Sequence, residues 1–142
     1  MSARRPSLVF VCVANSCRSQ MAEAIAKSAG GSSWDVWSAG SQPGGRVHPL
    51  ARELMREIGL DLSTHRSKGI SELPVRQWDY VVTMGCGDAC PAIPANQRLD
   101  WALPDPTMLP AAEARHVRDQ LIQRIHELME RSTWRGQPQP AG

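Results

Sequence analysis

Short apolar stretches recur along the chain and are separated by glycine, proline and polar residues. The first stretch, Leu-Val-Phe-Val-Cys-Val, is apolar throughout, which is typical of a strand buried on both faces of a parallel sheet. The other stretches are equally short and suit strands rather than helices. The predicted strands are residues 8–13, 34–39, 78–84 and 98–102.

Between these strands, apolar residues recur every three or four positions, which predicts amphipathic helices. The predicted helices are residues 21–29, 48–59 and 111–131. Alternating strands and helices predict an α/β fold with a four-stranded, mainly parallel sheet flanked by helices. We expect a single domain over residues 7–132 and a disordered tail, rich in proline and glycine, over residues 133–142.

Composition excludes several classes of protein. The chain has 142 residues, with 16 Lys and Arg against 14 Asp and Glu, and no basic block that would bind nucleic acid. It contains neither an apolar run long enough to span a membrane nor a signal peptide, so we expect a cytoplasmic protein. Its four cysteines are then reduced thiols, and catalytic or metal-binding roles are the ones to test.

A C-x5-R-S pattern, from Cys12 to Ser19, follows the first predicted strand and opens the first predicted helix. Open α/β sheets bind ligands at this place, where a short loop turns backbone N–H groups toward an oxyanion and the helix N-terminus adds positive charge. Asn15 suits a left-handed position in the loop, and Arg18 has the geometry to grip two anion oxygens. The same field favours a nucleophilic thiolate at Cys12, to which the Ser19 hydroxyl is placed to donate a hydrogen bond. The alternative is a buried strand cysteine before an ordinary helix.

The candidate oxyanion ligands are Val13, Ala14, Asn15, Ser16, Cys17 and Arg18. We expect Cys17 to pack under the loop and assign it no redox role. The four histidines have no metal-ligand spacing, so no metal site is predicted from them.

The stretch V-C-V-A-N-S-C-R-S-Q-M-A-E resembles the anion loop of low-molecular-weight protein tyrosine phosphatases, and more closely that of the arsenate reductases sharing their fold. The resemblance continues through Ser-Ala-Gly, His-Pro, Gly-Leu-Asp and Asp-Pro motifs and covers about residues 7–131. It implies a phosphatase-like fold, with Asp105 as the general acid that protonates the leaving oxygen. A turn aspartate before proline is the alternative for Asp105.

In the arsenate reductases that this chain resembles, three cysteines act in relay. The resemblance implies that Cys12 attacks arsenate, that Cys86 then attacks Cys12, and that Cys90 attacks Cys86 and carries the disulfide to a reducing partner. The interval between Cys86 and Cys90 is shorter here than in the best-known relay enzymes. Residues four apart in a helix have Cα atoms roughly 6 Å apart, near the long limit for a disulfide. The alternatives for this pair are a zinc site, which lacks a second pair of ligands, and two buried cysteines without a role.

The leading hypothesis is an arsenate reductase that takes arsenate or phosphate oxyanion and is re-reduced by thioredoxin. A small thiol such as mycothiol or glutathione is an alternative electron donor. The runner-up is a low-molecular-weight protein tyrosine phosphatase, although no aromatic residue follows Asp105-Pro106 to clamp a phosphotyrosine ring. A third hypothesis is a non-catalytic module that binds oxyanions or senses thiols, without a general acid.

No cofactor is expected. Some reductases of this fold hold a potassium ion beside the loop through an asparagine, a glutamate, a serine and an aspartate. Asn15, Glu23 and Ser38 match the first three, but Lys68 stands where the aspartate would fall. We therefore expect the Lys68 ammonium to replace the ion, the alternative being a solvated surface lysine.

Overall fold

The computed structural model describes residues 5–85 and 93–136, in which strands alternate with helices along the chain. The elements, in order, are β1 (Ser7–Cys12), α1 (Arg18–Gly30), η1 (Gly31–Ser33), β2 (Asp35–Gly40), α2 (Pro49–Arg56), η2 (Ile70–Glu72), β3 (Trp78–Thr83), β4 (Ala95–Asp100), η4 (Pro106–Met108) and α3 (Ala111–Gly136).

The four strands form one parallel sheet in the order β2-β1-β3-β4, which confirms the predicted fold class. Cys12 lies opposite Gly40 of β2, and Val11 lies opposite Thr83 of β3. Because all strands run in one direction, their carboxyl ends share one edge of the sheet. β1 lies in the middle with a neighbour on each side, and its carboxyl end is the usual ligand position in this architecture.

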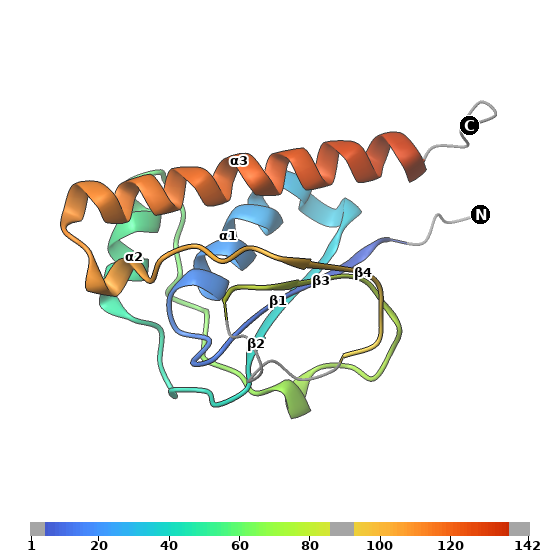
Figure 1. Ribbon diagram of the computed structural model, residues 1–142, viewed down its shortest axis with the longest axis horizontal. Helices are drawn as coiled ribbons and strands as arrows, with labels where there is room; N and C mark the ends of the chain where they lie inside the picture. The colour runs from blue at the N-terminus through green and yellow to red at the C-terminus, as the bar shows by residue number, and fades with distance from the viewer. Residues whose placement is uncertain (1–4, 86–92, 137–142) are drawn as a thin grey trace.

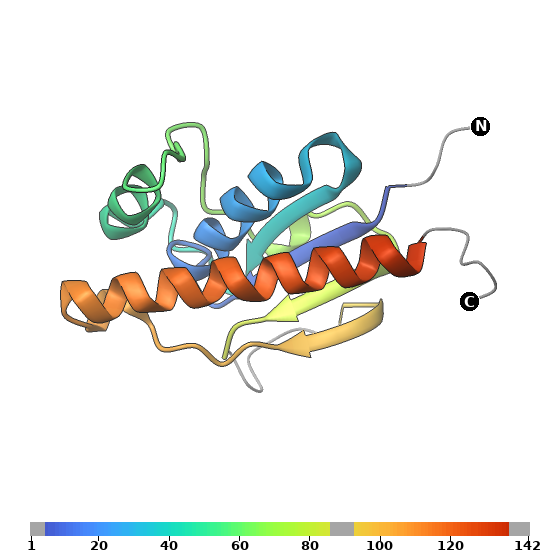
Figure 2. The ribbon, with the colours of Figure 1, turned by 90° about the horizontal axis from the view of Figure 1, so that it is seen from above.

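Both faces of the sheet are covered, which explains the unbroken apolar run of β1. Leu8 and Phe10 face a large apolar core formed with α1, α2 and α3. Val9 and Val11 face a smaller core with Val81 of β3. The long helix α3 runs across the molecule above α1, and η2 lies on the opposite side of the sheet (Figures 1 and 2).

Several predicted boundaries were wrong. α1 begins three residues before the predicted start at Met21, and α2 ends three residues before the predicted end at Gly59. β4 begins three residues before the predicted position, because it is an edge strand with alternating half-buried and exposed side chains and lacks an apolar run. The helix α3 continues to Gly136, into the segment expected to be a disordered tail, since no proline or glycine interrupts residues 132–135. Over the described ranges, no helix has both the length and the apolar character needed to cross a membrane.

Candidate active site

The C-x5-R loop joins β1 to α1 at the carboxyl end of β1, in the middle of the row of strand ends. Cys12 is the last residue of β1, and Arg18 is the first residue of α1. Cys12 is buried, whereas Val13 between them is partly exposed. The fold therefore presents the loop at the ligand-binding edge of the sheet, with the N-terminus of a 13-residue helix behind it.

The carbonyl groups of the loop are held by donors that surround it. The pairs are Cys12 O with Ser41 N (3.1 Å), Val13 O with Gln42 N (2.8 Å), Ala14 O with Gly44 N (2.9 Å), Asn15 O with Gln20 Nε2 (3.1 Å), Ser16 O with His48 N (2.9 Å) and Cys17 O with Met21 N (2.9 Å). In a trans peptide the C=O and N–H groups point in opposite directions. Carbonyls drawn outward therefore turn the N–H groups of residues 13–18 toward the inside of the loop, as an oxyanion site requires.

Asn15 is the centre of the hydrogen bonds inside the loop. It has a φ of 51°, which confirms the left-handed conformation expected for it. Its side chain donates through Nδ2 to Ser19 Oγ (2.8 Å) and Ser38 Oγ (3.0 Å), and its Oδ1 accepts from Lys68 N (2.7 Å). These contacts offset the strain of the backbone and fix the curl of the loop.

The Cys12 sulfur has two hydrogen-bond partners. Asn15 N donates to Sγ at 3.2 Å, and Ser19 Oγ lies 2.9 Å from it. Because Ser19 Oγ already accepts a hydrogen from Asn15 Nδ2, the hydroxyl hydrogen of Ser19 is available for the sulfur. The expected contact between Ser19 and Cys12 is thus present, and it stabilises a thiolate more than a thiol.

Gly40, the last residue of the Ser-Ala-Gly segment, allows this loop to pack against β2. A Cβ atom at Gly40 would lie 2.5 Å from Val13 O and 2.9 Å from Asn15 N. No side chain fits there without moving the loop, so the glycine of this motif has a steric role.

The second loop cysteine, Cys17, differs from Cys12 in its surroundings. Burial, together with the negative charge of Asp105, raises the pKa of the Cys17 thiol to about 12. Cys17 therefore remains a thiol at neutral pH, which agrees with the expectation that it packs under the loop without a redox role.

Arg18 connects the loop to the segment that carries Asp105. Its Nη1 donates to Leu103 O at 2.6 Å, two residues before the aspartate. Asp105 caps η4, with Oδ1 accepting from Thr107 N (3.0 Å) and Thr107 Oγ1 (2.7 Å), and its side chain is half-buried. Its second carboxylate oxygen is thus not used by these capping bonds.

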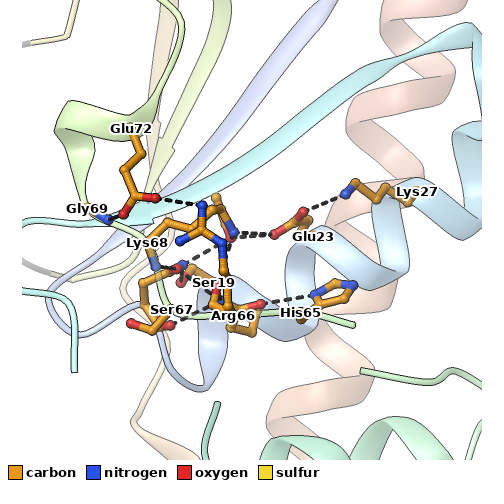
Figure 3. A network of polar contacts seen from close by, with 12 residues as sticks. Ser19, Glu23, Lys27, His65, Arg66, Ser67, Lys68, Gly69 and Glu72 are labelled. Atoms are coloured by element: carbon orange, nitrogen blue, oxygen red, sulfur yellow. Dashed lines mark hydrogen bonds and ion pairs between the residues drawn. The ribbon is translucent and has the colours of Figure 1, made fainter. Parts of the chain in front are cut away.

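Behind the loop lies a charged cluster centred on the buried Glu23 (Figure 3). Glu23 accepts from Ser38 Oγ (2.5 Å) and pairs with Lys27 Nζ (2.6 Å) and Lys68 Nζ (3.4 Å). Burial alone would raise the pKa of Glu23, but bonds from Lys27 and Ser38 and the Lys68 charge lower it below its ordinary value. Lys68 Nζ also lies 3.4 Å from Ser38 Oγ and 3.3 Å from Arg66 O, so it is part of the cluster and not a solvated surface lysine.

Sequence reasoning missed two polar side chains beside the loop. Gln20 is fully buried, and it donates to Asn15 O and accepts at Oε1 from the His65 ring at 3.0 Å. Burial and the ammonium groups of Lys27 and Lys68 lower the pKa of His65, against the opposing effect of Glu23. No clear signal in the sequence marks Gln20, because it follows the polar residues Arg18 and Ser19 at the start of the helix.

The cysteines expected to act with Cys12 lie outside the described residues. Cys86 and Cys90 fall within residues 86–92. Gly85, which directly precedes Cys86, lies beside the loop, since a Cβ on it would be 3.7 Å from Arg18 Nη1. Its neighbour Met84 donates to Val11 O at 3.0 Å.

Sequence comparison places the chain among known proteins. The family model of low molecular weight phosphotyrosine protein phosphatase matches residues 7–135. Arsenate reductase 2 of Staphylococcus saprophyticus is 41% identical over 127 residues, which cover 87% of this chain and 95% of that protein. An arsenate reductase of Staphylococcus aureus (strain Newman) is 40% identical over 121 residues, covering 82% and 91%.

Solved structures agree with this placement. An arsenate reductase in its phosphate-binding state has a TM-score of 0.79 at 35% identity and covers 89% of this chain and 98% of its own. A thioredoxin-dependent arsenate reductase of Corynebacterium glutamicum has a TM-score of 0.74 at 37% identity, covering 92% and 63%. With a family match over nearly all of the folded chain, these findings establish that the chain belongs to the low-molecular-weight phosphotyrosine protein phosphatase family.

Proposed function

We propose that the chain reduces arsenate to arsenite, with Cys12 as the nucleophile. The observation that carries this proposal is the loop itself, in which N–H groups turn inward around a sulfur that accepts from Ser19 and Asn15. Such a loop suits a tetrahedral oxyanion, and relatives about 40% identical to this chain are named arsenate reductases.

In the first step, the Cys12 thiolate attacks the arsenic of arsenate, and an As–O bond breaks as a S–As bond forms. Arg18 and the N–H groups of the loop hold the remaining oxygens. Asp105 donates a proton to the departing oxygen, which leaves as water. The link from Arg18 to Leu103 supports this role, because it ties the segment carrying the acid to the anion site.

The second step needs two electrons, which the Cys12 sulfur and a second thiol supply together as they form a disulfide. Cys86 attacks the Cys12 sulfur, the S–As bond breaks, and its electron pair reduces the arsenic so that arsenite leaves. Cys90 then attacks Cys86, which frees Cys12 and forms a Cys86–Cys90 disulfide. The place of Gly85 beside Arg18 supports this relay, because Gly85 directly precedes Cys86 in the sequence.

Thioredoxin is the proposed reductant of the final disulfide. The Corynebacterium glutamicum relative is named thioredoxin-dependent, and an internal pair of cysteines suits a protein dithiol donor. A relay of free thiols also suits the reducing cytoplasm. If the chain turned over with mycothiol or glutathione but not with thioredoxin, the electron donor would be a small thiol, and the proposal of an arsenate reductase would stand.

Arsenate-dependent oxidation of NADPH, coupled through thioredoxin and its reductase, tests the function. The wild type should turn over, Cys12→Ser should lose activity, and Cys90→Ser should stop after one turnover with a Cys12–Cys86 disulfide visible by peptide mass mapping. Normal turnover in Cys90→Ser would refute the relay.

Hydrolysis of an aryl phosphate tests the second candidate, a phosphatase, which the family match favours. A wild type that hydrolyses the aryl phosphate efficiently and leaves arsenate unreduced with every thiol donor would be a phosphatase. The absence of both activities would leave only an oxyanion-binding module.

We also propose that Lys68 takes the place of a potassium ion. The oxygens of Glu23 and Ser38 are each 3.4 Å from Lys68 Nζ, so a cation bound to the same oxygens would meet the ammonium and be repelled. Potassium at constant ionic strength should leave the activity and melting temperature of the wild type unchanged. Lys68→Asp should gain a potassium dependence, whereas a potassium effect on the wild type would refute the replacement.

A further inference from the structure

We propose that Gln20 is a positioning residue that fixes the Asn15–Ser16 peptide of the anion loop and so directs the Ser16 N–H at the bound oxyanion. The expected effect of Gln20 on arsenate turnover rests on the function proposed above. Its expected effects on anion binding and on the Cys12 thiol do not depend on that function.

Gln20 lies in the first turn of α1, and helical side chains point back toward the N-terminus of their helix. Its amide is therefore directed at the loop that precedes α1. The side chain is completely buried, so an unsatisfied amide group there would be costly.

The hydrogen-bond partners define how the amide is oriented. Nε2 lies 3.1 Å from Asn15 O, 2.9 Å from Asn15 Oδ1 and 2.8 Å from Arg66 O, which are all acceptors. The opposite atom, Oε1, lies 3.0 Å from His65 Nδ1, so the histidine ring donates the hydrogen to it. One buried side chain thus joins the loop to the segment of His65 and Arg66, which lies against the charged cluster (Figure 3).

Among the loop carbonyls, that of Asn15 differs in its donor. Each of the other five, on residues 12, 13, 14, 16 and 17, accepts from a backbone N–H group, which no substitution by a non-proline residue removes, and Ala14 O accepts in addition from Ser67 Oγ. The Asn15 carbonyl accepts from a side chain, Gln20 Nε2. The orientation of this peptide therefore depends on the identity of residue 20.

Loss of the Gln20 side-chain amide should release the Asn15–Ser16 peptide, which lies at a strained position of the backbone. Asn15 has a positive φ, and a backbone of this kind persists only when its surroundings fix it. If the Asn15 carbonyl rotates, the Ser16 N–H rotates with it, away from the anion. The Asn15 N–H that donates to Cys12 Sγ belongs to the neighbouring peptide and should lose alignment as well.

The test compares two substitutions of the same kind. Gln20→Met keeps the length of the side chain and removes its donors. Gln123→Met makes the same change at an exposed glutamine of α3, whose amide lies 3.4 Å from Glu127 Oε2. Gln20→Glu is the second variant, since it keeps the volume and places a carboxylate against acceptors to which it cannot donate.

Three readouts separate positioning from general stability. They are the Kd for inorganic phosphate by calorimetry, the pH midpoint of Cys12 alkylation by peptide mass mapping, and the melting temperature. For both Gln20 variants we expect phosphate binding weakened about tenfold or more and an alkylation midpoint at higher pH, with Gln123→Met unchanged. In arsenate turnover, KM should rise together with a fall in kcat/KM.

A folded Gln20 variant with a lower melting temperature, but the phosphate affinity and alkylation midpoint of the wild type, would overturn the proposal and leave Gln20 a structural residue. Phosphate binding and alkylation require no arsenate turnover. They would therefore still support or refute the role of Gln20 if the chain proved not to reduce arsenate.

Discussion

Replacing Ser19 with alanine isolates the contribution of one hydroxyl to the reactivity of Cys12. Ser19 is fully buried and its Oγ lies 2.9 Å from Cys12 Sγ. The substitution leaves Asn15 Nδ2 with its second acceptor, Ser38 Oγ at 3.0 Å, so the loop keeps its main support. The expected change is therefore in the charge state of the sulfur rather than in the fold.

The size of the effect follows from the type of hydrogen bond that is lost. A bond to a charged group contributes about 1.5–3 kcal/mol. Since 1.36 kcal/mol corresponds to a factor of ten in rate, the alkylation of Cys12 at neutral pH should be slower in Ser19→Ala than in the wild type by about tenfold or more.

Alkylation of Cys12 by iodoacetamide at neutral pH, followed over time by peptide mass mapping, measures this rate. Ser41→Ala is the matched control, because Ser41 Oγ is buried and makes no hydrogen bond within the described part of the chain. Its backbone N–H, which holds Cys12 O, is kept. An unchanged alkylation rate in folded Ser19→Ala would refute the assignment of the hydroxyl as a donor to the Cys12 sulfur.

Two further predictions concern charged side chains. Arg18→Lys should lower kcat/KM for arsenate roughly a hundredfold. An ammonium cannot hold two anion oxygens in the way a guanidinium does, and it cannot at the same time donate to Leu103 O. A loss below threefold in steady-state kinetics would contradict this. Hydrogen bonds from Arg115 and Arg118 lower the pKa of Glu57 from 4.5 to about 2, so the stability from this pairing is present above pH 4.5 and is lost as the pH falls toward 2. Thermal unfolding of Glu57→Gln should therefore depend less on pH in this window than that of the wild type, and identical slopes would argue against the pairing.

The pattern of the sequence was sufficient for the parts of the fold that depend on local chemistry. The apolar run of β1 and the polar loop after it predicted the strand to within one residue at each end, although the helix that follows begins at Arg18, three residues before its predicted start. A buried central strand has to be apolar on both faces, and this leaves a clear signal. The edge strand β4 has no such requirement, and its start was wrong for that reason.

The support of the loop was less visible, because it comes from segments distant in sequence. The backbone donors Ser41, Gln42, Gly44 and His48 act through N–H groups that every non-proline residue has, so their side chains give no clue. Gln20 looks like an ordinary polar residue near a helix start until its burial is known. The resemblance to reductases did indicate Lys68, whose contacts with Glu23 and Ser38 the structure contains.

The outward attachment of the loop carbonyls has a thermodynamic consequence for the ligand. The chain loses the conformational entropy of the loop when the domain folds, since the donors belong to the folded protein and not to the anion. An arriving oxyanion therefore has little chain to order, and its association should show only a small change in heat capacity, unlike a reaction that couples folding to binding. The loop should also keep its shape after the product leaves, so that each new anion meets a site that is already assembled.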